Sequence, residues 1–282
     1  MTIPRIILML ALTGLAGFTL VAISGPEKPG DLPLSAPGEL KNARLLYHRS
    51  DGIYLRTPGD RYAKKLLGNA RYPRWAPDGS GFAFIRDDQV MLYSFASKSE
   101  RALARAKKLQ SVAFHPAGKE VWFIDGESIR SVHISNGEVK TMREGIDVRE
   151  FDIAPDGRYV AATIKRLVGF RVELLGLPAG KDTAIARGCS ASISPDGKYV
   201  TVNTGDHTTL SLRHLGNGKE WKTLLAPAGM KLDDQQWSNH PDWIVGVGEN
   251  AKGYVIAHRV SDGKAWRITP ESDGGRPDLY VE

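Results

Sequence analysis

The side chains that could perform chemistry are scattered along this chain of 282 residues. Its 7 histidines include no H-x-x-x-H or H-x-x-E-H spacing, which would place two imidazoles on one face of a helix for metal binding. The segment Gly188-Cys189-Ser190-Ala191-Ser192 differs from the G-x-S-x-G pattern of a serine nucleophile at its last position. Asp51-Gly52 and Asp87-Asp88 lack the spaced acidic run of a calcium loop. We therefore predict no catalytic residue, no metal site and no cofactor.

The first residues have the composition of a targeting segment. Arg5 is the only charge before an apolar run of 18 residues, 6–23, and small side chains at Ala22 and Ser24 precede Gly25. This pattern is typical of an export signal cleaved before Gly25. The run is also just long enough to cross a bilayer, so an uncleaved membrane anchor is the alternative for residues 1–24. Either way, the rest of the chain is predicted to be exported, to a periplasmic or extracellular location.

The single cysteine excludes an internal disulfide, and the net charge indicates the class of partner. Cys189 is the only cysteine, so an intramolecular disulfide is excluded, and we expect it to be a small buried side chain. The net charge of +6 and the pI near 9.3 favour an acidic partner. For an exported chain, that partner is expected to be a protein or an acidic envelope polymer, and nucleic acid is not expected.

A repeat with a period near 40 residues organises the rest of the chain. Its units begin at residues 75, 114, 153, 193 and 237, which gives spacings of 39, 39, 40 and 44. The units read WAPDGSGFAFI, FHPAGKEVWFI, IAPDGRYVAAT, ISPDGKYVTVN and WSNHPDWIVGV. A Pro-Asp-Gly turn or a variant of it joins two strands in each unit, and later turns such as Asn136-Gly137 and Asp262-Gly263 join two more. Four antiparallel strands per repeat are typical of the blades of a β-propeller.

Two incomplete units at the chain ends predict how the propeller closes. Residues 44–67 contain strands and a turn but lack the first strand of a repeat. The C-terminal segment supplies one, because Pro277 aligns with Pro73, two positions before the Trp75 anchor. We therefore predict an all-β fold, a six-bladed β-propeller closed by pairing of the N- and C-terminal strands. It spans residues 44–282 and follows the signal or anchor helix and a Pro- and Gly-rich linker at 25–43.

The Pro-Asp-Gly repeats, with Trp75 and Trp237 before the turns, resemble the repeat of the TolB-type propeller family. The resemblance covers residues 44–282 and implies an exported propeller that binds partners. TolB carries an α/β domain before its propeller, and the linker at 25–43 is too short to hold one. Any role that needs that domain is therefore not carried over.

The predicted binding site is the mouth of the central channel, where the innermost strands begin. Reading four and three residues before each anchor, and adding Arg276 from the closing strand, gives a ring of candidate binding residues. They are Arg71, Tyr72, Gln110, Arg149, Glu150, Asp233, Asp234 and Arg276, with Ser111, Cys189 and Ser190 at the equivalent positions and Asp206-His207 on a nearby loop.

Two functions remain open from the sequence. The preferred one is a non-enzymatic, monomeric binding or scaffold propeller that is exported and tethered to the membrane if residues 6–23 are retained. The alternative is a propeller enzyme that acts on a glycan, with its chemistry in the central channel. A converging cluster of histidines or carboxylates in the channel would favour the enzyme.

Overall fold

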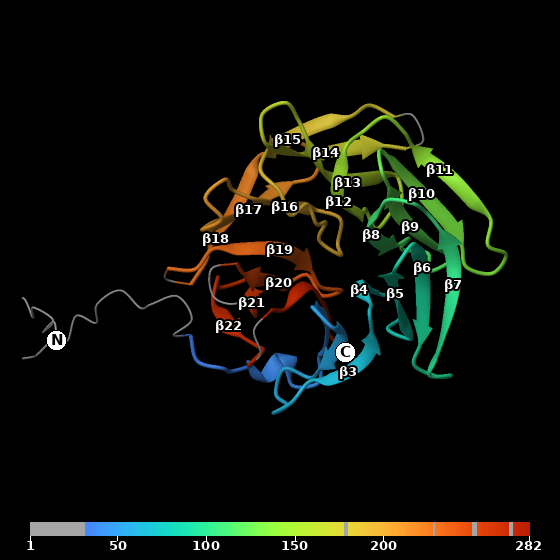
Figure 1. Ribbon diagram of the computed structural model, residues 1–282. Coiled ribbons are helices and arrows are strands. Elements are labelled where there is room, and N and C mark those ends of the chain that lie inside the picture. The colour runs from blue at the N-terminus through green and yellow to red at the C-terminus, as the bar shows by residue number, and fades with distance from the viewer. Residues whose placement is uncertain (1–31, 178–179, 228, 250–252, 271–272) are drawn as a thin grey trace, which may run out of the picture.

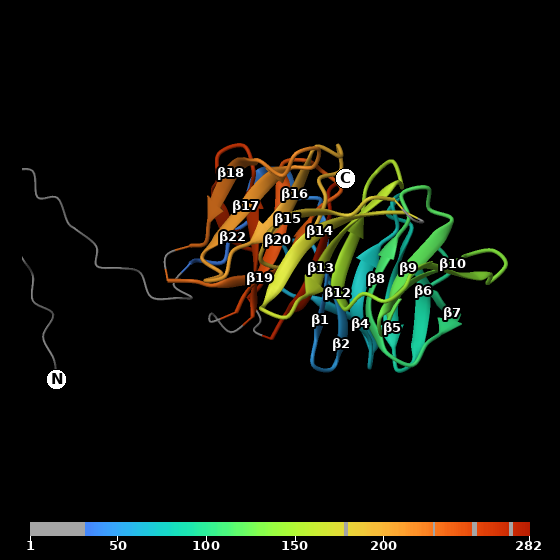
Figure 2. The ribbon, with the colours of Figure 1, turned by 90° about the horizontal axis from the view of Figure 1, so that it is seen from above.

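The computed structural model describes residues 32–177, 180–227, 229–249, 253–270 and 273–282, and these residues form six antiparallel sheets around a central axis (Figure 1). The prediction of an all-β, six-bladed propeller is confirmed. Figure 2 shows the same sheets from the side, stacked next to one another. Because each sheet covers its neighbour's face, the hydrophobic core lies between the blades.

The blades follow one another along the chain, and each has its innermost strand next to the axis. Blade 1 contains β23 (Gly275–Tyr280), β1 (Arg44–Arg49), β2 (Gly52–Arg56) and β3 (Lys64–Gly68). Blade 2 contains β4 (Arg71–Trp75), β5 (Gly81–Arg86), β6 (Gln89–Ser94) and β7 (Ser99–Arg105). Blade 3 contains β8 (Leu109–Phe114), β9 (Glu120–Asp125), β10 (Ser128–His133) and β11 (Val139–Arg143).

The second half repeats the pattern with one exception. Blade 4 contains β12 (Val148–Ile153), β13 (Tyr159–Lys165), β14 (Phe170–Gly176) and β15 (Thr183–Arg187). Blade 6 contains β19 (Leu232–Trp237), β20 (Trp243–Gly248), β21 (Tyr254–Arg259) and β22 (Ala265–Arg267). Blade 5 has three strands in its sheet, β16 (Tyr199–Asn203), β17 (Thr209–His214) and β18 (Glu220–Leu225).

The inner segment of blade 5 departs from the predicted four-stranded blade. It is joined to β16 by the isolated bridges Cys189↔Asn203 and Ile193↔Val200 and by the Thr201 amide, which donates to the Ser192 carbonyl at 2.9 Å. The Thr201 side chain explains the difference, because its hydroxyl accepts a hydrogen bond from the Ser192 amide at 2.9 Å and donates to the Ser190 carbonyl. A side chain therefore replaces part of the backbone ladder in this blade.

The two ends of the chain close the propeller as predicted. β23 pairs antiparallel with β1, with Leu45 opposite Leu279 and Arg44 opposite Tyr280. Leu279 is 1% exposed and packs in a core shared with Leu45 and Trp243. The closing strand thus fills the innermost position of blade 1 and covers the backbone edge of β1.

The Pro-Asp-Gly turns have the structural role that the sequence predicts. The carboxylates of Asp78 and Asp156 each accept a hydrogen bond at 3.0 Å from the amide two residues on, and Asp196 does so at 3.2 Å. The following glycine takes a positive φ, as at Gly79 with 68°. These carboxylates are used by the turns themselves.

The predicted signal or anchor segment, 1–24, lies outside the described residues. Of the predicted linker, 25–43, the described part lies against blades 6 and 1, where the Ser35 amide donates to the Arg267 carbonyl at 3.0 Å. The short helix η1 (Gly38–Leu40) follows, and Leu40 is fully buried in the core that contains Leu279. Among the described residues, no helix is both long and apolar enough to cross a bilayer.

Candidate functional site

Four inner segments share an unusual backbone conformation at the mouth of the channel. Tyr72, Ser190, Asp234 and Arg276 have φ values of 56°, 56°, 53° and 47°, in the left-handed region that non-glycine residues seldom adopt. In β4, β19 and β23 a register shift at the same place marks a β-bulge. Such positions persist only where the surroundings hold them.

Side chains from the preceding blade hold these bulges in place. The Tyr72 amide donates to His48 Nδ1 at 3.4 Å, the Ser190 amide donates to Glu150 Oε1, and the Arg276 amide donates to Asp234 Oδ2 at 3.1 Å. An innermost strand has no partner strand on its channel side, so its amides need acceptors of another kind. The mouth side chains provide them.

A second ring of acceptors lies deeper in the channel. The Ile193 amide donates to Asp152 Oδ2 at 2.8 Å, and the Trp75 amide donates to Asp278 Oδ2 at 2.8 Å. The Trp237 amide donates to Ser192 Oγ at 2.9 Å. In each case the acceptor comes from the preceding blade, so the polar lining of the channel fastens one blade to the next.

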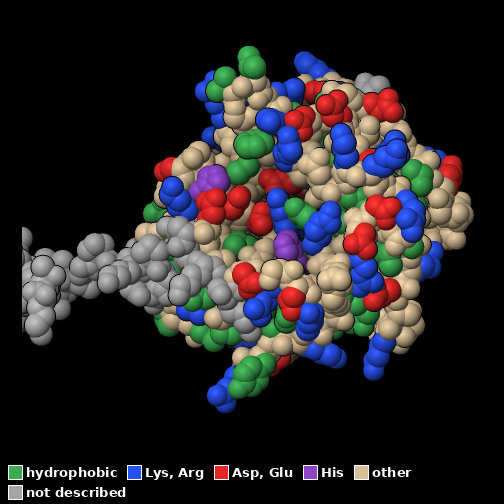
Figure 3. All heavy atoms as spheres, viewed as in Figure 1, with side chains coloured by type: hydrophobic (Ala, Val, Ile, Leu, Met, Phe, Trp, Pro, Cys, Tyr) green, Lys and Arg blue, Asp and Glu red, His purple; other side chains and the backbone are tan. Residues whose placement is uncertain are grey.

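The charged centre of the mouth is an ion cluster that spans the channel. Arg276 on β23 forms ion pairs with Glu150 on β12 and with Asp234 on β19, the latter at 3.0 Å. The Arg276 guanidinium also lies 5.2 Å from the centre of the Tyr72 ring. Figure 3 shows acidic, basic and histidine side chains gathered in this central hollow.

Burial and mutual pairing set the protonation of this cluster. Burial alone would raise the pKa of Glu150, but Arg276 and the hydrogen bonds from Thr163 and Ser190 outweigh it and hold that pKa below its ordinary value. Burial raises the pKa of Asp234 despite Arg276. Burial, with the charge of Arg276, also lowers the pKa of His48 to about 4, so His48 is neutral and can accept the Tyr72 amide.

The structure places all eight predicted site residues near the mouth but gives them different roles. Tyr72, Glu150, Asp234 and Arg276 join the central cluster. Arg71 stacks on Tyr72 at 5.5 Å and donates to the Leu109 carbonyl of blade 3 at 3.2 Å. The remaining residues lie outside the cluster: Arg149 is ion-paired with Asp147 at 3.0 Å, Gln110 lies on β8, and Asp233 faces blade 5.

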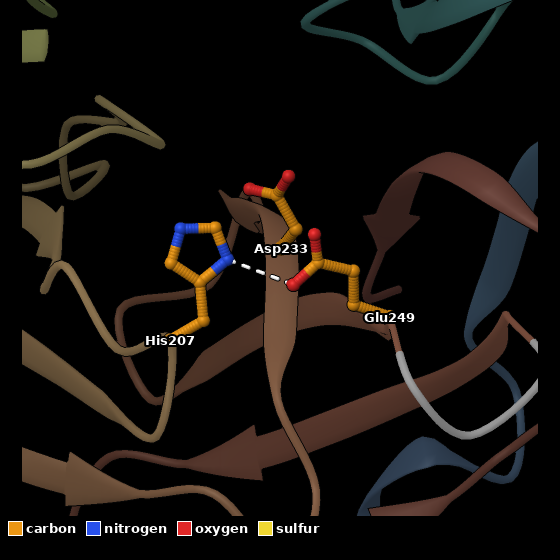
Figure 4. Close-up of side chains that lie close together, drawn as sticks. All are labelled: His207, Asp233 and Glu249. Carbon is orange, nitrogen blue, oxygen red and sulfur yellow. Dashed lines mark hydrogen bonds and ion pairs between the residues drawn. The ribbon is translucent and has the colours of Figure 1, made fainter. Parts of the chain in front are cut away.

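A second cluster lies beside the ion cluster. The sequence placed Cys189, Asp233 and His207 near the mouth, but it predicted neither Glu249 nor the contacts among them. His207 Nδ1 is 2.9 Å from Glu249 Oε2, and Cys189 Sγ is 3.8 Å from both His207 Nε2 and Asp233 Oδ1. Figure 4 shows His207, Asp233 and Glu249 converging from blades 5 and 6. Burial first, and then the Asp233 and Glu150 carboxylates, raise the pKa of the Cys189 thiol to about 12.

An exposed apolar tip is the third feature of the mouth end. The turn between β13 and β14 carries Leu167 at 103% and Val168 at 74% relative exposure, followed by Phe170 at 43%. The register of β12, β13 and β14 places this turn at the end where the inner strands begin. The sequence shows this tip as the apolar pair Leu167-Val168 inside a turn, where polar residues are the norm.

The opposite end of the channel, between the Pro-Asp-Gly turns, contains a cavity of 290 Å³. Asp152, Gln236 and Asp278 line it, and Gln236 Nε2 donates to Asp152 Oδ2 at 3.2 Å. Burial raises the pKa of Asp278 to about 6, and Asp152 adds to the effect.

The raised pKa of Asp278 predicts a pH-dependent stability. Because the folded state holds this proton more tightly than the unfolded chain, the stabilisation is complete below about pH 4 and is lost as pH rises through about 6. Asp278→Asn should therefore raise the free energy of unfolding at pH 7 by on the order of 2–3 kcal/mol and flatten its pH profile. Urea unfolding between pH 4 and 8 measures both effects.

Asp156→Asn is the matched control. Hydrogen bonds lower the pKa of this exposed turn carboxylate, so its removal should lower the free energy of unfolding at pH 7. If Asp278→Asn is less stable than the unaltered protein at pH 8, the ionised carboxylate is needed as an acceptor and the prediction is wrong.

Comparison at the level of sequence finds no matching protein-family model and no matching curated protein. The six sheets around the axis define a six-bladed β-propeller. Among solved structures, the fold is similar to that of TolB from Acinetobacter baumannii, at 18% identity and a TM-score of 0.70, over 86% of this chain and 67% of that one. TolB from Agrobacterium tumefaciens matches at 16% identity and a TM-score of 0.55, over 65% of this chain and 70% of that one. The expected resemblance of fold to the TolB-type propeller is thus confirmed.

Propellers outside TolB match as well. A chain of a nidogen/laminin complex matches at 10% identity and a TM-score of 0.69, over 84% of this chain and 98% of that one. A chain of hydrazine synthase from Kuenenia stuttgartiensis matches at 12% identity and a TM-score of 0.57, over 87% of this chain and 81% of that one. At these identities the comparisons show the shared fold.

Proposed function

We propose that this chain is an exported, non-enzymatic binding propeller that docks a protein partner on its mouth end. The observation that carries the proposal is the apolar tip formed by Leu167 and Val168. Large apolar side chains that project fully into solvent beside a charged hollow have the features of a binding anchor, because anchors bury apolar area within a polar rim. The solved nidogen/laminin complex provides a precedent for a propeller in a protein complex.

The tip is held in a fixed conformation before any partner arrives. Arg166 Nε lies 2.9 Å from Glu173 Oε1 and Arg166 Nη2 lies 2.6 Å from Glu173 Oε2. The Arg166 amide also donates to the Gly169 carbonyl at 3.0 Å, which closes the turn. A turn that is already ordered loses little conformational entropy on binding, so more of the contact energy appears as affinity.

The charge around the tip favours an acidic partner. The chain carries a net charge of +6, and Lys165, next to the tip, is exposed. Such a field raises the encounter rate with acidic surfaces more than it raises affinity. Arg276, in contrast, is tied to Glu150 and Asp234, so we assign it to the fold and not to the partner contact.

The double variant Leu167→Ser, Val168→Ser should weaken partner binding about 10- to 100-fold, because each lost anchor removes on the order of 1 kcal/mol or more. Its thermal unfolding should match that of the unaltered protein, since both side chains are already exposed. Surface plasmon resonance against the partner isolated from envelope extract measures the change.

Val139→Ser, Tyr159→Ser is the matched control, because these exposed residues begin β11 and β13 at the end of the propeller away from the mouth. Equal loss of affinity in the two double variants would rule out the mouth end as the docking surface.

A second candidate function is a glycan-active enzyme with its chemistry in the channel. The observation that favours it is the carboxylate pair Asp152 and Asp278 in the 290 Å³ cavity, with the pKa of Asp278 near 6. Against it, Asp152 Oδ2 accepts from Ser192, Ile193 and Gln236, and Oδ1 accepts from the Ile153 amide, so both oxygens already have partners. Release of reducing ends from envelope polysaccharide that is lost in Asp278→Asn would establish this function instead.

A further inference from the structure

We propose that Cys189, His207 and Asp233 bind a transition-metal ion of the zinc class at the channel mouth, with Glu249 orienting the histidine. The site goes beyond the partner docking proposed above and is independent of it. Its residues come from the inner segment of blade 5, the β16–β17 turn, the start of β19 and the end of β20.

The spacing of the donor atoms fits a tetrahedral site. Bonds of about 2.3 Å to sulfur and about 2.0–2.1 Å to nitrogen or oxygen, at tetrahedral angles, place sulfur roughly 3.5 Å from the other donors. The Cys189 Sγ lies 3.8 Å from His207 Nε2 and 3.8 Å from Asp233 Oδ1. His207, Asp233 and Glu249 offer donor atoms within 4.8 Å of one another. Shortening each Sγ contact from 3.8 Å to about 3.5 Å takes a movement of a few tenths of an ångström.

Glu249 gives the histidine the tautomer that a metal requires. An ionised carboxylate only accepts hydrogen bonds, so in the neutral imidazole the 2.9 Å contact places the proton on His207 Nδ1. The lone pair is then on Nε2, which is the ring nitrogen that faces Cys189. A carboxylate behind a histidine is the usual second layer of a metal site (Figure 4).

The chemistry of the donors selects the class of ion. A thiolate and an imidazole favour zinc and similar borderline or soft ions over magnesium and calcium, which take oxygen donors. A carboxylate completes a set of three protein donors and leaves one tetrahedral position open. Ser190 Oγ donates to Asp233 Oδ1 at 3.2 Å and helps to fix that carboxylate.

The same geometry also resembles a thiol nucleophile with a histidine base and a carboxylate behind it. Asp233 distinguishes the two interpretations. A carboxylate oxygen 3.8 Å from Sγ opposes an unpaired thiolate, whereas a cation between the two groups is attracted by both. The position of Asp233 therefore favours the metal site over the nucleophile.

The test is a Co²⁺ titration of the metal-free full chain, followed by absorbance. The proposal predicts one Co²⁺ per chain, the visible bands of tetrahedral cobalt, a thiolate charge-transfer band, and displacement by Zn²⁺. Cys189→Ser should remove the charge-transfer band, and Asp233→Asn and His207→Ala should each weaken binding at least 10-fold. Glu249→Gln, at a side chain that is 48% exposed, should retain the fold and weaken binding about 10- to 100-fold.

His133→Ala and Asp88→Asn are the controls, because His133 ends β10 in blade 3 and Asp88 lies on the β5–β6 turn of blade 2, away from this cluster. Both should leave cobalt binding unchanged. Absence of binding at one ion per chain, or binding that Cys189→Ser and Glu249→Gln leave intact, would overturn the proposal. Rapid alkylation of Cys189 in the metal-free chain that depends on His207 would also overturn it and identify a nucleophile.

Discussion

A chain that lacks Gly275–Glu282 is expected not to fold. Its loss removes β23, the backbone partner of β1, and leaves the inner edge of β1 unpaired. It also removes the buried Leu279 and the Asp278 carboxylate that accepts the Trp75 amide of blade 2. Together these losses are comparable to the whole free energy of unfolding of a typical domain, about 5–15 kcal/mol. Circular dichroism and thermal unfolding of the truncated chain measure the result.

Deletion of Glu282 alone is the control, because it removes only the surface ion pair with Arg44 at 2.9 Å. An exposed pair of this kind contributes about 0–1 kcal/mol, so the midpoint of unfolding should change little. If the chain without Gly275–Glu282 unfolds at the same temperature as the full chain, the closure by β23 makes no contribution and the account of the fold is wrong.

Arg276→Met should destabilise the fold by about 3–5 kcal/mol. The change leaves the buried carboxylates of Glu150 and Asp234 without their cation, and an uncompensated buried charge is more costly than the pair itself. Glu150→Gln should have a smaller effect, because Arg276 retains Asp234 and the amide oxygen can still accept from Ser190 and Thr163. Urea unfolding of both single variants measures the difference.

The double variant Arg276→Met, Glu150→Gln provides the control for this prediction. If the two residues act as a pair across the channel, the double variant should be more stable than the sum of the single effects predicts. Additive effects would mean that Arg276 and Glu150 contribute separately, and the ion cluster would not connect the blades.

The repeat predicts most of the architecture because each Pro-Asp-Gly turn is determined by residues next to one another. The alignment of Pro277 with Pro73 even extends to conformation, since the preceding residues, Arg276 and Tyr72, have φ values of 47° and 56°. The inner segment of blade 5 was less predictable, because it depends on where the Thr201 hydroxyl points.

The candidate sites were only partly predictable, because they depend on contacts between side chains of different blades. Periodicity places Glu150, Asp234 and Arg276 at equivalent positions, but it does not show that Glu150 and Asp234 accept hydrogen bonds from amides of the next blade. His207 and Glu249 lie on turns 42 positions apart, so no short motif connects them. Sites that form between blades become visible only when the blades are placed in space.

The claim that the mouth end binds the partner is tested most directly by site-specific photo-cross-linking in cells. A photoreactive amino acid at Leu167 lies on the proposed docking surface, and one at Lys219 lies on an exposed turn at the opposite end. We predict a discrete higher-mass adduct from position 167 and none from position 219. Adducts from position 219 alone, or from neither position, would contradict the assignment of the mouth as the binding end.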